Sequence, residues 1–528
     1  MTSIDPPHHL DDPEPTDGEG SYSMRSSRWI PTRHLLAPLA VFLLTLFLRM
    51  LVVGGPPSND EGYYAFNADL AWRGAGIYQI SPINFYPPLI RWAGMPPETP
   101  FLHLRIADAF VAAGAAVMVF FFLSRWTESW VAFAMASGWS IASNLPLVVE
   151  SGFRNSIMAA TIAYLGALWF LSSQSRWSPF WAGLLIPLAV FMREAFFLVV
   201  IVSLYLAAML HGRRGLMVHV AGLVTAGCAL LLWLDLFRGP PLEILGYFRV
   251  EIPTYYDKLT RWREIDTERW AYLRTTLRFT MWLMPPAFLG VVWLLVPGRG
   301  ERVAKGLAIL LFLPPLYEIF TKYCLPYHWA QLFLGIAFLG AMGLHWLLSV
   351  CRSSNRGWLM IGGLAAVAWL VGELDARTLY RAYREGYRLS REFGPVMVWG
   401  RWDDASIERS RFLEMAKFIR DRTTSDDRIV ASPFLHGLYP LSGRLPPSTS
   451  SADSFLMSVM RYPVRRPDVI EMLRQHPPRL VFENLRYPVE FTDFWPDFES
   501  RYRLARTFPE DLNKYTGNLQ VRVWELKE

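Results

Sequence analysis

The sequence predicts a polytopic α-helical membrane protein with a soluble α/β region at its C-terminal end. Hydrophobic residues make up 52% of the 528 residues and aromatic residues 15%, and the mean hydropathy is +0.20. This composition is too apolar for an ordinary soluble enzyme. Apolar stretches long enough to cross a bilayer recur as far as residue 374. They stop near residue 378, where Arg, Asp, Glu and Pro become more frequent.

At about 20 residues for each crossing, the chain contains about 11 candidate transmembrane helices. They cover residues 34–53, 103–123, 129–149, 153–172, 178–192, 195–211, 215–237, 279–297, 303–321, 328–350 and 357–374. The segments on either side of Arg193 are short and closely paired.

The charge of the chain indicates topology rather than nucleic-acid binding. The net charge is +6 and the isoelectric point is about 9.1, but the arginines lie at the ends of apolar segments and form no single patch. A cytoplasmic N-terminus makes every short inside loop basic, as the positive-inside rule requires. The sequence therefore predicts a multi-pass protein of the inner cell membrane with its C-terminal region on the periplasmic side. The three cysteines show neither a disulfide framework nor metal-ligand spacing.

Three regions follow from this topology. Residues 1–33 are expected to be a disordered cytoplasmic tail. Residues 34–377 form the transmembrane domain, in which 54–102 is a structured first outer loop, and residues 378–528 form the outer α/β domain. In the first outer loop, Tyr63, Phe66 and Leu70 recur at helical spacing and predict an amphipathic helix on the membrane surface.

The α/β character of the last region comes from alternating patterns. Helix-like stretches at 412–419 and 469–473 alternate with strand-like stretches at 428–431, 479–482 and 521–524. No glycine-rich nucleotide-binding fingerprint accompanies them.

Ionisable residues gather on the predicted outer face. Asp60 and Glu61 open the first outer loop; Ser58 and Glu61 have the spacing of a helix capping box, which explains Glu61 but Asp60 only in part. Glu150 follows the third span, where an exposed pair with Arg154 is an alternative explanation. Arg193 and Glu194 could instead form a polar hairpin between two apolar segments. His328 could instead belong to an interfacial aromatic belt.

Together these side chains could carry out glycosyl transfer from a phosphate-linked donor. A carboxylate can take the proton of an acceptor hydroxyl, and an arginine can bind phosphate oxygens. Glu61 and Glu150 are candidate ligands of a divalent metal such as Mg, Mn or Zn. The candidate set is Asp60, Glu61, Glu150, Arg193 and His328.

Three short motifs resemble those of a known family. They are Asp60-Glu61 followed by Tyr63-Tyr64-Ala65, then Tyr86-Pro87-Pro88-Leu89, then His328-Trp329-Ala330-Gln331. Their order over residues 34–350 resembles the C-type (GT-C) membrane glycosyltransferases that use polyprenyl-phosphate sugars. This group includes protein O-mannosyltransferases and bacterial aminoarabinose transferases.

The resemblance implies roles for individual residues. Asp60 corresponds to the catalytic base, Glu150 to an acid that assists acceptor or metal binding, and Arg193 to the residue that meets the donor phosphate. Many relatives have lysine where this chain has Tyr86, so another cation must neutralise the phosphate. The candidates for this cation are Arg193, Arg91 and Arg105, with His328 as a further phosphate contact. Substrate contacts are assigned to Tyr64, Tyr86, Tyr327 and Gln331.

The predicted reaction is transfer, with inversion, of a sugar from a polyprenyl-phosphate donor to a lipid, glycan or protein acceptor. A lipid or polysaccharide flippase is one alternative, although no inverted repeat is evident. A polymerase or ligase of the same superfold using a lipid-pyrophosphate donor is another, and a non-catalytic scaffold is a third. Pocket shape sets the sugar and the acceptor, which the sequence leaves open.

Overall fold

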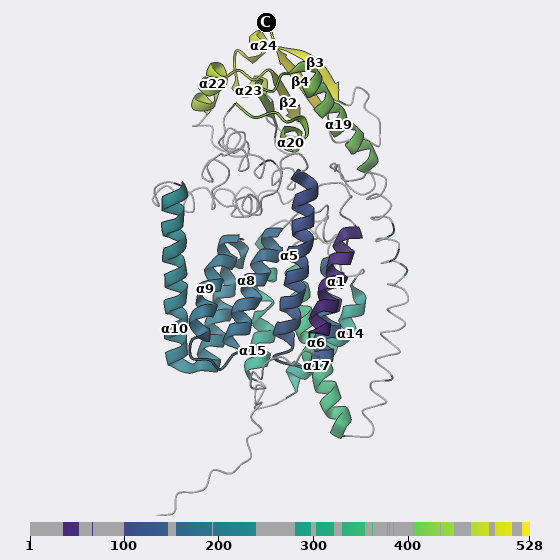
Figure 1. Cartoon of the computed structure of the whole chain (residues 1–528), viewed down its shortest axis with the longest axis vertical. Helices are drawn as coiled ribbons and strands as arrows, with labels where there is room; N and C mark the ends of the chain where they lie inside the picture. The colour runs from purple at the N-terminus through teal and green to yellow at the C-terminus, as the bar shows by residue number, and fades with distance from the viewer. Residues whose placement is uncertain are drawn as a thin grey trace, which may run out of the picture.

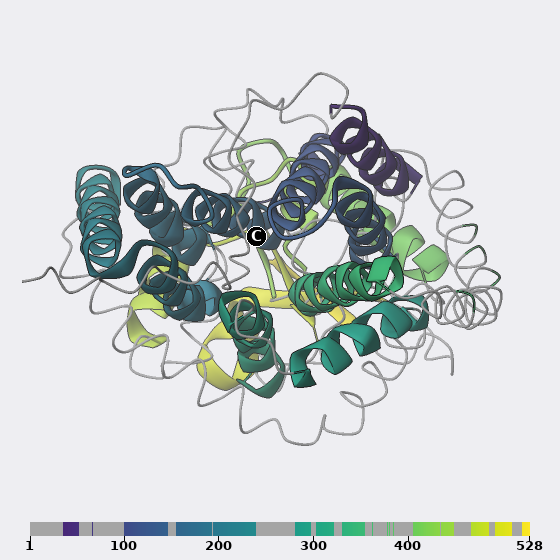
Figure 2. The same cartoon turned by 90° about the horizontal axis from the view of Figure 1, so that it is seen from below.

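The computed structural model divides into a helix bundle and an α/β unit beyond one end of it (Figure 1). The described residues are 35–51, 66, 100–145, 155–192, 194–238, 280–296, 302–321, 330–353, 362, 377, 380, 384, 405–432, 435–447, 466–484, 491–508 and 520–527. Seen along the helices, the yellow strands of the α/β unit lie behind the bundle (Figure 2). The domain boundaries drawn from the sequence stay a prediction, because most of residues 354–404 lie outside this set.

The bundle consists of α-helices with two short 3-10 segments. Its elements are α1 (Leu36–Leu51), α5 (Pro100–Leu123), α6 (Ser129–Ser143), α8 (Asn155–Leu171), α9 (Ser178–Met192), η2 (Glu194–Leu198), α10 (Val199–Arg238), η5 (Met281–Leu283), α14 (Met284–Leu295), α15 (Arg302–Leu310), α16 (Leu313–Thr321) and α17 (Ala330–Ser353). Three described stretches are long and apolar enough to cross a membrane: Arg105–Leu123, Phe196–Leu230 and Gln331–Arg352. The count of about 11 spans stays a prediction.

Helix α10 is two helices joined at Gly212. This residue has φ 64° and ψ −166°, a left-handed conformation that glycine adopts without steric cost. The sequence predicted two spans with a junction here, and the break confirms that junction. Arg213 and Arg214 follow directly and lie at the turn.

The candidate span predicted at 303–321 is not one continuous helix. The chain forms two helices of nine residues, α15 and α16, with a turn at Leu311 and Phe312 between them. Pro314 and Pro315 explain the break, since proline is tolerated in the first turn of a helix but disrupts a helix interior. Nine helical residues extend only about 14 Å, less than the thickness of a bilayer core.

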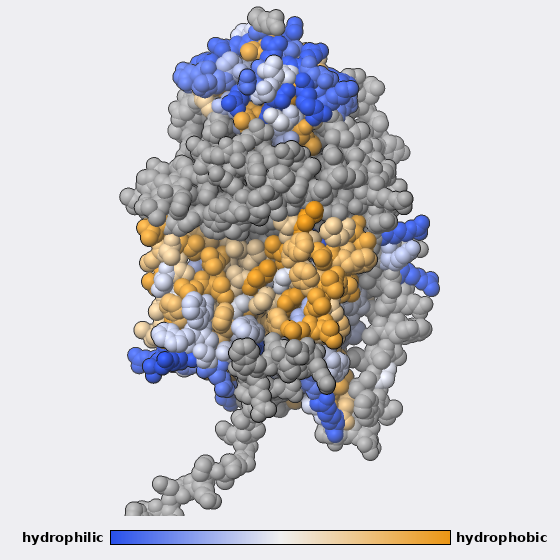
Figure 3. All heavy atoms as spheres, in the orientation of Figure 1, coloured by the Kyte–Doolittle hydropathy of each residue, from blue (hydrophilic) through white to orange (hydrophobic). Residues whose placement is uncertain are grey.

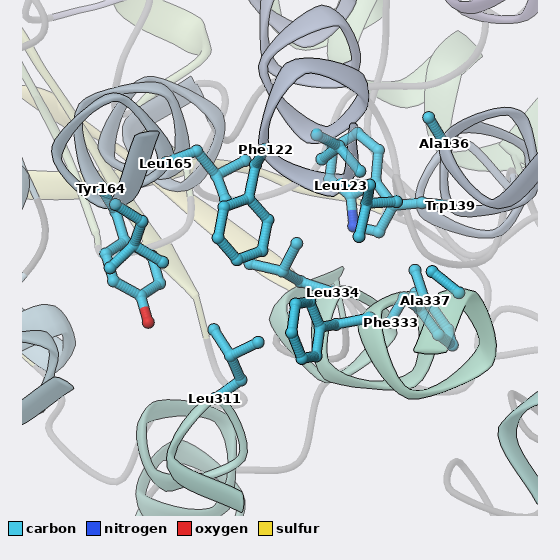
Figure 4. Close-up of a cluster of buried hydrophobic side chains, with 14 of the residues drawn as sticks. Phe122, Leu123, Ala136, Trp139, Tyr164, Leu165, Leu311, Phe333, Leu334 and Ala337 are labelled. Carbon is cyan, nitrogen blue, oxygen red and sulfur yellow. The ribbon is translucent and has the colours of Figure 1, made fainter. Parts of the chain in front are cut away.

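The bundle core is apolar and closely packed (Figure 4). Trp139 of α6, Phe122 of α5 and Phe333 of α17 are fully buried in it. Helices α14 and α17 approach so closely that a Cβ atom on Gly290 would lie 2.2 Å from the Leu339 carbonyl oxygen. Small residues at such crossings are typical of membrane helices.

The outer surface of the bundle is a broad apolar band with charged residues below it (Figure 3). Large apolar side chains such as Leu295 and Phe288 are 80% and 67% exposed. These apolar helices and their exposed band are those of a membrane protein.

Basic residues collect at the end of the bundle that is remote from the α/β unit. We name this the basic end; it carries Arg125, Arg176, Arg213, Arg214, Arg302, Lys305 and Arg352. The opposite end, here called the unit-facing end, contains the last residues of α1, α6 and α9 and the first residues of α5, α8 and α17. Which end faces the cytoplasm stays a prediction from the positive-inside rule.

The α/β unit contains a four-stranded sheet in the order β1-β2-β4-β3. Its elements are α19 (Ala405–Arg422), β1 (Ile429–Ala431), α20 (Leu438–Ser442), α22 (Arg466–Gln475), β2 (Leu480–Asn484), α23 (Phe491–Phe494), α24 (Phe498–Arg501), β3 (Tyr502–Phe508) and β4 (Val521–Leu526). Strand β1 is parallel to β2, whereas β4 is antiparallel to both β2 and β3. The helix- and strand-like stretches identified in the sequence fall within these elements, but β3 was missed because its sequence lacks a regular apolar alternation.

The sheet buries one apolar cluster on each face, as the two-residue period of a strand requires. One cluster includes Ile429 of β1 and Phe482 of β2 together with Met415 of α19. The other includes Val430 and Val481 from the same two strands together with Trp495.

Phe66, from the predicted first outer loop, joins the cluster that contains Ile429. It is helical, as the spacing predicted, and its side chain is fully buried. The expectation that this side chain lies on the membrane surface is wrong, because it packs in the core of the α/β unit.

Candidate functional site

Two of the predicted site residues lie in the part of the chain that the structure describes. Arg105 is in the second turn of α5, and Gln331 is the second residue of α17. The other predicted site residues lie outside the described residues: Asp60, Glu61, Tyr64, Tyr86, Arg91, Glu150, Arg193, Tyr327 and His328. Their roles stay predictions.

The structure places Arg105 in a buried charged cluster at the unit-facing end. Arg49 Nη1, from the last turn of α1, lies 3.0 Å from Asp108 Oδ2 on α5. Arg105 precedes Asp108 by three residues, so both project from one face of α5, and Arg105 interacts electrostatically with this carboxylate. We name Arg49, Arg105 and Asp108 the charged triad.

All three members of the charged triad are removed from solvent. Arg49 is 7% exposed, Arg105 3% and Asp108 2%. Charged groups at membrane depth are costly and usually contact one another or face a cavity. With its carboxylate ionised, the triad carries two positive charges and one negative charge, which favours an anion nearby.

A strip of uncharged polar groups continues from the triad toward the bundle interior. Thr45 lies one turn before Arg49 on α1, and its hydroxyl lies 2.6 Å from that of Ser140 on α6. Asn144, which caps the end of α6, donates through Nδ2 to the Ser140 carbonyl oxygen at 2.6 Å. The Thr45–Ser140 hydrogen bond joins α1 to α6, and the Arg49–Asp108 ion pair joins α1 to α5, so polar contacts hold these three helices together.

Gln331 lies at the same end of the bundle and is 6% exposed. Its Nε2 atom has no hydrogen-bond partner among the described residues. Buried amide donors normally have a partner. The substrate contact assigned to Gln331 stays a prediction.

Sequence reasoning missed Arg49 and Asp108. Both lie within predicted apolar spans, 34–53 and 103–123, and neither was selected as a candidate site residue. An ionisable residue inside a span is itself a signal of function or of a buried partner. Applied to each span, that rule would have selected both residues, but it would not have paired them.

No metal site is visible among the described residues, which contain no group of three or more His, Cys, Asp or Glu side chains placed to hold an ion. Glu61 and Glu150, the candidate metal ligands, lie outside this set. The metal therefore stays a prediction.

The basic end contains a second ion pair, with a different role. Glu128 accepts two hydrogen bonds from Arg352, at 2.5 and 3.1 Å, and one from Trp130. The hydrogen bond from Arg352 is the main reason that the pKa of Glu128 falls to about 2. The pair joins the loop before α6 to the end of α17, which makes it a structural link.

Comparisons with known proteins give similarity of structure without similarity of sequence. No family model matches the chain, and no curated protein matches it. Among solved structures, it is similar to the archaeal oligosaccharyltransferase AglB from Archaeoglobus fulgidus, solved in complex with an inhibitory peptide and a dolichol-phosphate. The TM-score is 0.49 at 12% sequence identity, over 86% of this chain and 69% of that chain. At this level the likeness shows neither a family nor a function.

Proposed function

We propose that this chain is a membrane glycosyltransferase that uses a polyprenyl-phosphate-linked sugar. The observation that carries the proposal is the buried charged triad at the unit-facing end. Residues 52–99, which contain Asp60, connect α1 to α5 at that end, directly between Arg49 and Arg105 in the sequence. Cationic side chains and the proposed base therefore belong to adjoining parts of the chain.

The proposed reaction proceeds with inversion in one displacement. Asp60 takes the proton of the acceptor hydroxyl, whose oxygen attacks the anomeric carbon of the donor sugar. The bond from this carbon to the phosphate oxygen breaks, and the polyprenyl phosphate leaves with the bonding electron pair. Positive charge stabilises this leaving group as its negative charge develops.

Three basic residues are proposed to supply that charge. Arg105 is supported by its burial beside Asp108, where a low dielectric strengthens its interaction with phosphate. In the sequence, Arg193 follows α9 directly and His328 precedes α17 by two residues. Arg105 is also the residue proposed to replace the lysine that many relatives have at the position of Tyr86.

The remaining roles are proposed from the sequence. Glu61 and Glu150 assist, either at the acceptor or as ligands of a divalent metal that would offset phosphate charge. Tyr64, Tyr86, Tyr327 and Gln331 contact the substrates. The acceptor is a lipid, glycan or protein on the periplasmic side, and its identity depends on the shape of the site.

Purified protein supplied with radiolabelled polyprenyl-phosphate sugars tests the proposal. We expect Asp60→Asn to lower kcat by at least about 100-fold, the range of a lost general base. Arg105→Gln should lower kcat/KM for the donor, and Arg176→Gln, an exposed cation at the basic end, is the matched control. Wild-type turnover by a folded Asp60→Asn variant would overturn the assignment.

The released carrier separates the proposed reaction from its rivals. A monophosphate carrier supports the transferase, whereas a pyrophosphate carrier indicates polymerase or ligase chemistry. A flippase would instead move labelled lipid between the leaflets of proteoliposomes without consuming the donor. The position of the triad near helix ends, away from the bundle middle, disfavours a transport pathway.

A further inference from the structure

A partly buried arginine without a counter-ion lies in the turn between α5 and α6. Arg125 is the middle residue of this turn, which spans residues 124–126 at the basic end of the bundle. Its side chain has no hydrogen bond or ion pair with the described part of the chain, and its Nε atom is buried. Buried polar groups normally have a hydrogen-bond partner, and buried charges normally have an opposite charge nearby. The protein supplies neither to Arg125 among the residues that the structure describes.

Hydrogen bonds and packing fix the backbone of this turn. The Arg125 N–H donates to the Phe122 carbonyl oxygen at 3.2 Å, and the Trp126 N–H donates to the Leu123 carbonyl oxygen at 3.0 Å. The Trp126 ring packs edge-on against Phe338 of α17, with the ring centroids 5.9 Å apart. The bundle therefore sets the position from which the Arg125 side chain extends.

The guanidinium group of Arg125 lies over an aromatic ring of a neighbouring helix. Its Cζ atom is 4.9 Å from the centroid of the Trp169 ring on α8, a distance at which the cation and the ring attract each other. The ring covers one face of the planar guanidinium, whereas the N–H groups lie in its plane and are not used by the stacking. A planar fork of N–H donors matches the oxygens of a phosphate group.

The nearest carboxylate in the sequence does not neutralise Arg125. Glu128 is the only carboxylate at the basic end among the described residues, and it accepts hydrogen bonds from Arg352 and Trp130. Burial lowers the pKa of the Arg125 guanidinium below its ordinary value, because it removes water from the charge. An anion bound from outside the protein would offset this loss of hydration.

The position of Arg125 along the bundle is that of lipid headgroups. Arg125 follows the apolar stretch Arg105–Leu123 by two residues, and the charged residues of this end lie directly below the exposed apolar band (Figure 3). Trp130, Trp177 and Trp181, also at the basic end, are each more than half exposed. Exposed tryptophans are typical of the interface between a membrane and water, where the phosphates of lipids lie.

We propose that Arg125 and Trp169 form a binding site for the phosphate group of an anionic phospholipid, in the leaflet at the basic end. The Arg125 N–H groups donate to the phosphate oxygens, and Trp169 holds the guanidinium in place. Basic sites between membrane helices bind lipid headgroups in this way. Because the site lies at the opposite end of the bundle from the charged triad, it does not depend on the proposed glycosyl transfer.

Arg176 provides a matched control at the same end of the bundle. Its Cζ atom is 5.8 Å from the centroid of the Trp177 ring, but both side chains are exposed. An exposed arginine contributes to the general attraction of anionic lipids without forming a site. Arg125→Gln and Arg176→Gln therefore remove the same charge from a site and from a surface.

Native mass spectrometry of the full-length protein, titrated with phosphatidylglycerol, tests the site. Arg125→Gln should weaken the first binding event by at least about tenfold, the effect of losing hydrogen bonds to a charged group. Arg176→Gln should change it by less than about twofold. Arg125→Lys keeps the charge but not the planar fork, and should recover only part of the affinity. Equal losses in the two glutamine variants, or no loss in either, would overturn the proposal.

A photo-crosslink to the wild-type protein tests the proposal even if Arg125→Gln does not fold. Phosphatidylglycerol with a diazirine in its headgroup is added to phosphatidylcholine nanodiscs, and mass spectrometry identifies the labelled peptides. We expect label within residues 124–130 or at Trp169, removed by excess unlabelled phosphatidylglycerol but not by diacylglycerol or inorganic phosphate. Removal by inorganic phosphate would indicate a site for free phosphate, and removal by diacylglycerol would indicate an apolar site. Either result, or absence of label from both segments, would overturn the proposal.

Discussion

Removing the anion of the charged triad should destabilise the bundle more than removing one of its cations. Asp108 lies between two arginines, so replacing it by Asn leaves two buried cations close together. Replacing Arg49 by Met leaves Asp108 beside Arg105, with opposite charges still adjacent. Asp108→Asn should therefore destabilise the protein more than Arg49→Met, although each variant loses the same ion pair.

The distance between the two charges sets the size of the expected loss of stability. At the observed 3.0 Å separation of Arg49 Nη1 and Asp108 Oδ2, two unit charges attract by about 5 kcal/mol at an effective dielectric constant of 20. Removing one member of a buried ion pair typically costs about 3–5 kcal/mol, because the remaining charge stays buried. We expect Asp108→Asn to fall in this range and Arg49→Met to cost less than half as much.

Reversible unfolding in detergent micelles, with steric trapping to obtain free energies, measures both variants. The double variant, Arg49→Met with Asp108→Asn, provides the decisive comparison. In Asp108→Asn alone, the two buried arginines repel each other without a carboxylate between them, and Arg49→Met removes one of these two cations. The double variant should be more stable than Asp108→Asn alone, a non-additivity expected of coupled neighbours. Equal destabilisation by the two single variants, or strict additivity in the double variant, would refute this electrostatic reasoning.

Two further predictions concern the structural links of the bundle. The pKa of Glu128 is about 2, below its ordinary value of 4.5, so its ion pair with Arg352 stabilises the folded state above about pH 4.5 and is lost as the pH falls toward 2. Over that window the unfolding temperature of the wild type should fall more steeply than that of Glu128→Gln, although solvent screening keeps the difference small for so exposed a pair; parallel curves would contradict it. Gly290→Leu should separate α14 from α17, since its Cβ would overlap the Leu339 carbonyl oxygen, and should cost at least about 1–3 kcal/mol in thermal unfolding. Gly227→Ala, where no atom lies within 4 Å of the added Cβ, is the control, and an equal effect of the two substitutions would refute the packing argument.

Local patterns were sufficient to locate most of the described helices. Apolar length predicted the segments that became α5 and α17, and the break at Gly212 occurs where the sequence placed a junction between two spans. The break at Leu311 and Phe312 inside the candidate span 303–321 was not predicted, because that span was assigned from its hydropathy and not from its two adjacent prolines. Backbone geometry, which proline restricts, decided that segment.

Local sequence patterns predicted less of the candidate site than of the helices. The sequence selected Arg105 and Gln331, and the structure places both at the unit-facing end of the bundle, buried from solvent. It did not select Arg49 or Asp108, whose pairing joins residues 59 positions apart. The other selected residues lie outside the described part of the chain, so their roles rest on motif order and on the tests given above.

Local sequence patterns are enough to predict a chain of apolar helices followed by alternating helices and strands, because hydrophobic periodicity and turn residues act over a few positions. They also show which residue types are available for phosphate chemistry. The pairing of Arg49 with Asp108 beside Arg105, and the entry of Phe66 into the core of the α/β unit, became visible in the folded chain. Both outcomes depend on which helix or strand faces pack together, and the free energy of that packing comes from burial and charge pairing between distant segments.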